Sequence, residues 1–418
     1  MREEGPNPPT GSNDRYFKAL WILFCLMLLI FGWGRTVFYS GNRIVFSCGD
    51  MARSTFIPLF VLYALYRAFR RDLAPVTFWR DPLFLFVALA ALSPLWGSLH
   101  DSSRVMDYLI PQYCAYLMAC YFLARSEGRL ASPLIAVLIS SVALMVLRAF
   151  FELIFIPGEV AIMHSSSEHH TILAMLVIMV LPLAAAQLTR QEATRGRALY
   201  GLALALFLAG IFFTSSRIGW IAFACQLLCW IALMKKGPAR LASVIVPLAL
   251  FLMLLFLFPQ VGKRFDTLGN LAGDRETGTR LMNWKMGLSL VADHPLLGIG
   301  YSNKEYYREA RAKDSHFQYE HPHNLYLQVL AYLGIAGLAV FGAIAIRTVR
   351  AFLSSKGKIP LWGAFLTSFL GFLVMNCADS ALNSQRATLI LLLILSCLYY
   401  QADHAGKAPM EALPGAGS

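Results

Sequence analysis

The chain has 418 residues, of which 57% are hydrophobic and only 14% are charged. Because so few polar residues cannot cover a soluble globule of this size, the composition indicates an integral membrane protein. The formal net charge of +12 is explained by membrane topology and by attraction to membrane lipids, and we therefore expect no nucleic-acid partner.

Twelve apolar segments are each long enough to cross about 30 Å of hydrocarbon as a helix. None of them alternates between apolar and polar residues as the strands of a membrane barrel do. We therefore predict an all-α polytopic membrane domain over 16–404, flanked by disordered tails over 1–15 and 405–418. The predicted spans are 16–37, 54–70, 82–99, 106–124, 133–156, 169–188, 198–215, 217–234, 241–258, 324–346, 360–376 and 387–401.

Lys and Arg cluster in alternate connections between these spans, which orients the chain by the positive-inside rule. We expect both termini in the cytoplasm and the long segment 259–322, between the ninth and tenth spans, outside. The short outer loops hold only six basic residues, namely Arg35, Arg43, Arg53, Arg104, Arg217 and Arg386.

The outer segment 259–322 has helical signals of its own. Thr279 is a suitable N-cap for a helix over 280–292, and Ser302-Asn-Lys-Glu305 is a capping-box pattern that opens a second helix. Both helices are amphipathic, so we expect them to lie over the outer membrane face. Between them, Gly298-Ile-Gly300 is interpreted as a turn.

Three basic groups lie at predicted helix starts on the outer side: Arg217, Arg280 and the His323-Asn324 pair. A cation at a helix N-terminus opposes the helix dipole, and three such groups repel one another. A bound anion removes this conflict, because helix N-termini and guanidinium groups both bind phosphate oxygens. The pattern predicts a diphosphate site, for which a polyprenyl diphosphate is the membrane-borne candidate. For Arg217 alone, the alternative is an arginine that reaches phospholipid headgroups.

His323 is the candidate general base. We expect a neutral imidazole there, because the nearby arginines and the helix N-terminus disfavour a further positive charge, and a neutral ring can accept a proton. The alternative is an interfacial histidine hydrogen-bonded to a backbone carbonyl. His321, two residues earlier, is given no role of its own.

A metal site is the less favoured interpretation of these residues. The His-x-His pair needs at least one more ligand to hold Zn²⁺. Histidines elsewhere in the chain that offer one are His164, His169, His170 and His294. The acidic pair of Asp274 and Glu276 is more typical of solvated surface than of a divalent-ion site. We expect neither a metal nor an organic cofactor.

Charged residues inside membrane spans usually line a cavity or a substrate path. Arg148 and Glu152 lie one helical turn apart in the fifth span, where they form either part of such a path or a buried structural pair. Asp379, near the outer end of the eleventh span, and Arg386, at the start of the twelfth, fit the same cavity. There Asp379 would orient the base or an arginine.

Together these motifs resemble the superfamily of O-antigen ligases and O-antigen polymerases, which are bacterial inner-membrane glycosyltransferases. The twelve predicted spans and the long outer loop agree with this resemblance. It is carried by Ser216-Arg217-x-Gly219, by Gly278-x-Arg280 with Trp284, by His294-Pro295-Leu296-Leu297-Gly298-x-Gly300, and by His321-Pro322-His323-Asn324-x-x-Leu327.

The resemblance implies a metal-independent glycosyltransferase of the GT-C type. Its donor would be a glycan on undecaprenyl diphosphate, at the periplasmic face of a Gram-negative inner membrane. His323 would deprotonate an acceptor sugar hydroxyl, which attacks the anomeric carbon with inversion. Arg217 and Arg280 would hold the diphosphate and stabilise its charge as it leaves. The charges and neighbours described above, rather than the resemblance, make Arg148 a diphosphate candidate and give His321, Asn324, Asp379 and Arg386 supporting roles.

Within this superfamily the sequence favours a ligase, whose acceptor would be lipid A-core. Polymerases of this type often carry Arg-x10-Gly segments in two outer loops, and these loops have none here. A polymerase and a protein O-oligosaccharyltransferase are the alternatives within the superfamily. A transporter of lipid-linked oligosaccharides is the alternative from another class. It would show internal repeats and interrupted helices around a mid-membrane site, whereas the unusual charges here lie towards one face.

Overall fold

The computed structural model describes ten stretches of the chain. The predicted tails 1–15 and 405–418 lie almost entirely outside them, as do His164 and Asp274. The described residues are 15–33, 37–40, 43–69, 81–97, 105, 109–155, 169–233, 238–258, 275–359 and 361–405.

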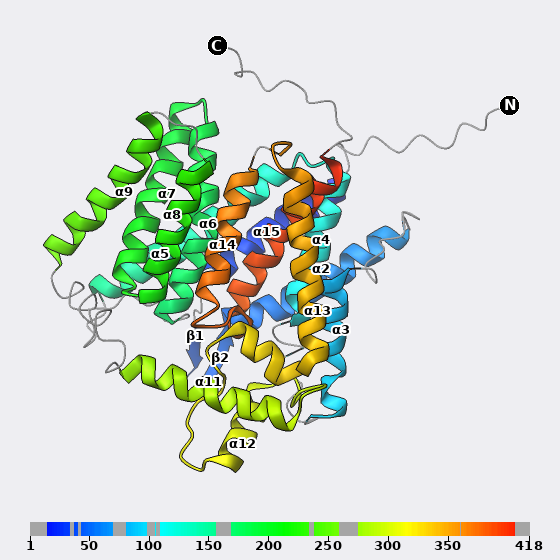
Figure 1. Ribbon diagram of the computed structural model, residues 1–418. Helices are drawn as coiled ribbons and strands as arrows, with labels where there is room; N and C mark the ends of the chain where they lie inside the picture. Colours follow the sequence, from blue (N-terminus) through cyan, green and yellow to red (C-terminus); the bar gives the residue numbers. More distant parts are fainter. Residues whose placement is uncertain are drawn as a thin grey trace.

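A helix lies at each of the twelve predicted spans (Figure 1). Five of these helices, namely α5, α6, α7, α13 and α15, are long and apolar enough to cross a membrane by their length and composition. The helices therefore support a multi-pass membrane protein, while the number of crossings and the GT-C type stay predictions. The bounds are α1 Arg15–Trp33, α2 Cys48–Phe69, α3 Pro82–Leu92, α4 Ile110–Arg125, α5 Ala131–Phe155, α6 His170–Arg190, α7 Thr194–Phe213, α8 Arg217–Leu233, α9 Pro238–Leu257, α13 Leu325–Ser355, α14 Trp362–Met375 and α15 Gln385–His404.

The first outer connection departs from the all-α prediction. Strands β1 (Val37–Ser40) and β2 (Arg43–Ser47) form an antiparallel pair, in which Ser40 lies opposite Arg43. Both strands are rich in β-branched and aromatic residues, and the sequence between them is Gly41-Asn42, which is typical of a tight hairpin. The prediction missed this signal because it ran the first apolar span on to residue 37.

In the long outer segment, helix α11 (Arg275–Asp293) begins earlier than predicted. Thr279 is therefore not its N-cap, and Arg280 lies in the second turn rather than the first. The extra turn brings Glu276 to the start of the helix, where a carboxylate stabilises the helix dipole. That stabilisation explains why the helix starts before the predicted cap.

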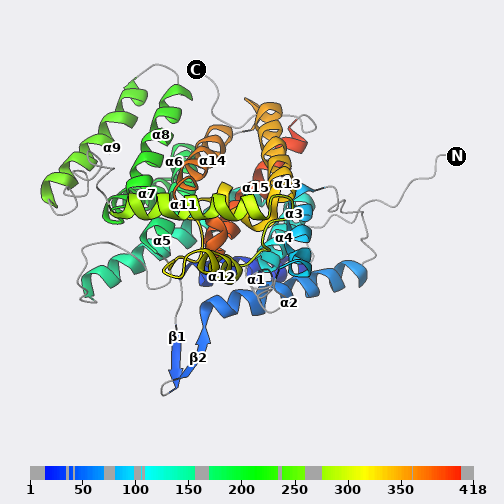
Figure 2. The same cartoon turned by 60° about the horizontal axis from the view of Figure 1, so that its bottom comes forward.

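The second predicted loop helix is confirmed as α12 (Asn303–Lys313), and the Ser302 side chain accepts a hydrogen bond from the Glu305 backbone N–H at 3.3 Å. Both loop helices lie at one end of the helical bundle (Figure 1). Figure 2 shows that α11 crosses this end from the side of α7 and α8 to the side of α13 and α3.

Helix α13 is interrupted at Gly334, where the backbone is not helical (φ 63°, ψ −160°). The segment Pro295–Gly300 supplies hydrogen-bond partners to the backbone groups on both sides of the break. The Gly298-Ile-Gly300 part of this segment, which was interpreted as a turn, therefore helps to stabilise an interrupted helix, and we call Pro295–Gly300 the brace of α13. The four hydrogen bonds run from Ile299 N to Ala331 O (3.0 Å), Gly300 N to Tyr332 O (2.9 Å), Ile335 N to Pro295 O (2.9 Å) and Ala336 N to Leu296 O (3.1 Å).

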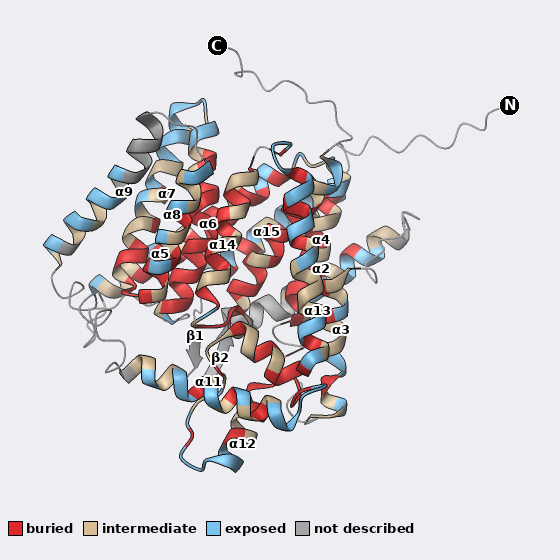
Figure 3. Ribbon diagram, in the orientation of Figure 1, coloured by how far each residue is buried: buried red, intermediate tan, exposed pale blue. Residues whose placement is uncertain are grey.

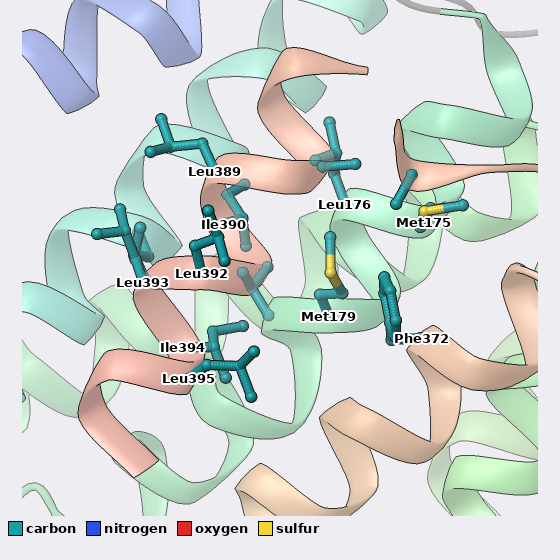
Figure 4. Close-up of a cluster of buried hydrophobic side chains, with 14 of the residues drawn as sticks. Met175, Leu176, Met179, Phe372, Leu389, Ile390, Leu392, Leu393, Ile394 and Leu395 are labelled. Carbon is teal, nitrogen blue, oxygen red and sulfur yellow. The ribbon is translucent and has the colours of Figure 1, made fainter. Parts of the chain in front are cut away.

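Helix α6 is the centre of the bundle. Of its most apolar window, 89% is buried within the protein, against 22% for α7, and Figure 3 shows this contrast along the two helices. Side chains of α6 such as Met175 and Met179 gather with Phe372 of α14 and with Leu389 of α15 (Figure 4). This core fixes α14 and α15, whose connection reaches the candidate site.

We predict that Gly334→Ala destabilises the protein. A Cβ at this position would lie 2.3 Å from the Leu296 backbone oxygen, and φ is positive, which strains any other residue by about 1–3 kcal/mol. The melting temperature in detergent should fall. Gly342→Ala is the matched control in the same helix, because its Cβ would meet nothing within 4 Å. Equal melting temperatures for the two variants would contradict the brace.

Candidate functional site

The start of α13 is attached to the connection between α14 and α15. The Leu325 N–H donates to the Asn376 carbonyl at 3.0 Å, and the Asn324 Nδ2 donates to the Cys377 carbonyl at 3.0 Å. The same Asn324 side chain caps α13 by accepting from the Leu327 N–H at 3.0 Å. Asn324 therefore both begins the helix and fixes the loop that carries Asp379.

His323 and Asp379 meet as a result. The His323 Nδ1 lies 3.7 Å from the Asp379 Oδ1, and the two side chains are 32% and 9% exposed. A substrate can therefore reach the imidazole while the carboxylate stays behind it. His323 and Asp379 are therefore neighbours, which is consistent with Asp379 orienting the base rather than an arginine. With Nδ1 turned towards the carboxylate, Nε2 is the ring nitrogen left to accept a proton.

Asp379 is held as a carboxylate. Burial raises the pKa of this group, but the hydrogen-bonding and charge contributions of His323, the charge of His321 and the Ser380 N–H outweigh burial, so the pKa of Asp379 lies below its ordinary value. The Ser380 N–H donates to Oδ1 at 2.8 Å. A negative charge is thus kept beside the candidate base.

His321 was expected only to support the site, and its contacts define that support. The His323 backbone N–H donates to the His321 Nδ1 at 3.2 Å, and the two ring centroids are 3.9 Å apart. His323 has a positive φ of 51°, which is uncommon for a residue with a side chain. His321 therefore helps to hold an uncommon backbone conformation that aims His323.

Arg217 and Arg280 are both paired with Glu276, a residue that the sequence pattern had indicated to be solvated surface. Arg217 Nη2 lies 2.8 Å from Glu276 Oε2, and Arg280 Nη2 lies 2.7 Å from Glu276 Oε1. The repulsion that we expected between the two cations is relieved by this internal carboxylate. Glu276 is therefore not solvated surface, and its spacing of four residues from Arg280 on one helix was the signal for this pairing.

Helix α11 links the arginine pair to the histidine. Gly287 packs so closely on the start of α13 that a Cβ there would lie 2.9 Å from Leu327 Cδ2 and 3.4 Å from Pro322 Cβ. Arg280 is seven residues earlier on the same helix, a rise of roughly 10 Å. The arginine pair and the start of α13 therefore contact α11 at points about two helical turns apart.

A sequence model of the O-antigen ligase family matches residues 202–342. This segment is therefore similar to the O-antigen ligase family. It contains Arg217, Glu276, Arg280 and His323, so the arginine pair and the candidate base both belong to it. No match was found among curated proteins.

Other predicted site residues lie outside the matched segment. Asp379 contacts that segment through His323. Arg148 Nε lies 2.7 Å from Glu152 Oε1, with both side chains largely buried, so the pair is formed and the role of Arg148 in diphosphate binding stays a prediction. Arg386 donates from Nε to the Phe31 carbonyl at 2.9 Å, which gives it a structural contact with the end of α1.

Asp379 is a candidate third ligand for a metal ion at the His321 and His323 pair. His321, His323 and Asp379 offer ligand atoms that all lie within 4.8 Å of one another, whereas the sequence pattern had suggested a further histidine as the third ligand. Three such groups suffice for a zinc site with an open position. They equally suit a histidine oriented by a carboxylate, and a chelator distinguishes the two arrangements.

We predict a pH-dependent stability difference between the protein and its Asp379→Asn variant. Because the pKa of Asp379 is lowered by folding, its carboxylate contributes stability above the unfolded pKa of about 3.9, and this contribution is lost as the pH falls through the folded pKa. The variant should melt at a lower temperature at pH 7. The difference in melting temperature between the protein and the variant should narrow below about pH 4. A difference that stays constant with pH would contradict a lowered pKa for Asp379.

Proposed function

We propose that the protein is an O-antigen ligase that transfers a glycan from undecaprenyl diphosphate to lipid A-core. The observation that carries this proposal is the placement of two arginines, bridged by Glu276 at the start of α11, and of a histidine beside Asp379, close to where α11 packs on the start of α13. The family match supports the same general kind of reaction. A lipid-linked donor would enter the site from the side of the membrane helices.

In the proposed reaction, His323 Nε2 takes a proton from a sugar hydroxyl of the acceptor. The hydroxyl oxygen then bonds to the anomeric carbon of the donor glycan, on the face opposite the leaving group, and the bond from that carbon to the diphosphate oxygen breaks. Configuration at this carbon is inverted. Asp379 stabilises the imidazolium that forms, as a carboxylate does in other histidine bases.

The leaving diphosphate gains negative charge as its bond to the sugar breaks. Arg217 and Arg280 stabilise that charge, and such preorganised electrostatic stabilisation is usually the largest contribution to a rate. Arg148 is a further diphosphate contact in this proposal. Asn324 and His321 position the base, and Arg386 supports the end of the bundle beside them.

The proposal includes a location and a fold type. The site would face the periplasm of a Gram-negative inner membrane, with both termini in the cytoplasm and twelve GT-C-type crossings. Catalysis would need no metal. The positive-inside distribution of basic residues supports this orientation.

A transporter is the second candidate, and the interruption of α13 at Gly334 is the observation that favours it. Interrupted helices form substrate sites in transporters because their backbone groups are left unpaired. Here Pro295–Gly300 pairs with those groups, which favours a structural break. Movement of the lipid-linked glycan across vesicles in the absence of an acceptor would support transport instead.

We predict that His323→Ala lowers transfer by at least about 100-fold, because general-base catalysis contributes about that much. The assay uses purified protein, undecaprenyl-diphosphate glycan and lipid A-core in the presence of EDTA. His316→Ala is the matched control, since this histidine of the same outer segment is 95% exposed, and it should retain full activity.

Each result of this assay has a distinct meaning. Full activity of His323→Ala would exclude it as the base, and loss of wild-type activity in EDTA would favour the metal arrangement. Extension of the glycan on its own carrier would identify a polymerase, and transfer to a polypeptide would identify a protein glycosyltransferase.

We predict that Arg217→Lys and Arg280→Lys each reduce kcat/KM by about tenfold or more, because lysine keeps the charge but loses the planar guanidinium that binds phosphate through two N–H groups. Arg311→Lys is the control, because Arg311 lies on α12 and donates to the Ser315 carbonyl. Unchanged kinetics in both clamp variants would contradict direct contact with the diphosphate.

A further inference from the structure

The carboxylate between the two arginines occupies the position that a phosphate group would need. Glu276 directs one oxygen to Arg217 and the other to Arg280, at 2.8 and 2.7 Å. A phosphate with two terminal oxygens binds a pair of guanidinium groups in the same way. Glu276 and a substrate phosphate would therefore compete for the same donors.

The exposure of the three side chains indicates which of them moves. The Arg217 side chain is 6% exposed and that of Arg280 is 21% exposed, whereas that of Glu276 is 35% exposed. Glu276 also lies in the first turn of α11, where a change of rotamer carries the carboxylate away without moving the arginines. Exchange of Glu276 for a phosphate is thus the least disruptive rearrangement.

Charge determines which ligands can displace the carboxylate. The two arginines with Glu276 carry a net charge of +1, and with Glu276 turned away they carry +2. A phosphodiester, such as a phospholipid headgroup, has one negative charge and gains little over a carboxylate that is already tethered at a high effective concentration. A diphosphate diester has two negative charges, which match both arginines.

We propose that Glu276 is a tethered competitor that weakens every phosphate ligand of the arginine pair by the same factor, so that only a ligand of high intrinsic affinity occupies the site. This inference rests on the proposed diphosphate site. It explains how two arginines at a membrane surface avoid being occupied by phospholipid headgroups, whose single charge binds weakly, while a diphosphate still binds. Glu276 sets the affinity threshold of the site, and it takes no part in proton transfer.

The test measures the affinity of the full-length protein in neutral detergent for inorganic pyrophosphate and for dimethyl phosphate by calorimetry. We expect the wild type to bind pyrophosphate and to discriminate strongly against dimethyl phosphate. Glu276→Gln removes the competing charge, so its affinity for dimethyl phosphate should rise by about tenfold or more. Its affinity for pyrophosphate should rise by a similar factor, because both ligands displace the same carboxylate.

Two further variants make the result specific. Glu309→Gln removes a carboxylate from neighbouring α12, where Glu309 lies beside Arg308, and should leave both affinities unchanged. Glu276→Asp keeps the charge but shortens the side chain, so it should give intermediate affinities and provides a readout if the glutamine variant does not fold. Melting curves establish that each variant is folded.

The outcomes separate this inference from the proposed function. Equal or weaker pyrophosphate binding by Glu276→Gln would show that Glu276 holds the arginines permanently, and would overturn the exchange alone. Failure of both the wild type and Glu276→Gln to bind pyrophosphate would overturn the arginine clamp, and the exchange with it. Equal gains in Glu309→Gln would also overturn the exchange, because the effect would then be one of overall charge.

Discussion

The break in α13 at Gly334 is the constraint on which the rest of the site depends. A membrane helix cannot leave backbone groups unpaired in an apolar surrounding, so Pro295–Gly300 must lie against the break. Close packing there requires glycine, since a Cβ on Gly298 would lie 2.4 Å from the Tyr332 backbone. This pairing fixes the end of α11 relative to the second and third turns of α13. The candidate base lies two residues before the same helix begins.

The sequence predicted the helices well because apolar length is a direct consequence of membrane thickness. It also predicted that Arg217, Arg280 and His323 would share one side of the membrane, because topology depends on where Lys and Arg fall. The hairpin after α1 was missed, since a short strand signal is weak beside a long apolar span. The early start of α11 was missed because a local cap at Thr279 is a weaker determinant than an ion pair formed with a distant helix.

The two carboxylates of the site show where sequence reasoning reaches its limit. Asp379 was expected to orient a partner, yet its partner could be identified as His323 only from the contacts between α13 and the connection that follows α14. Glu276 was judged to be surface, because nothing in the sequence places Arg217 beside it, 59 residues away. Pairs that depend on tertiary contact between distant segments are not encoded in any local pattern.

The two carboxylates differ in burial, and this difference suits them to different roles. The Asp379 side chain is 9% exposed, and moving it away would leave His323 without the charge that stabilises an imidazolium, so it stays in place through a proton transfer. The Glu276 side chain is 35% exposed and partners two cations that a diphosphate can also neutralise. A fixed anion therefore suits the base, whose charge changes during the proposed reaction. An exchangeable anion suits the arginines, whose charge is constant while their ligand changes.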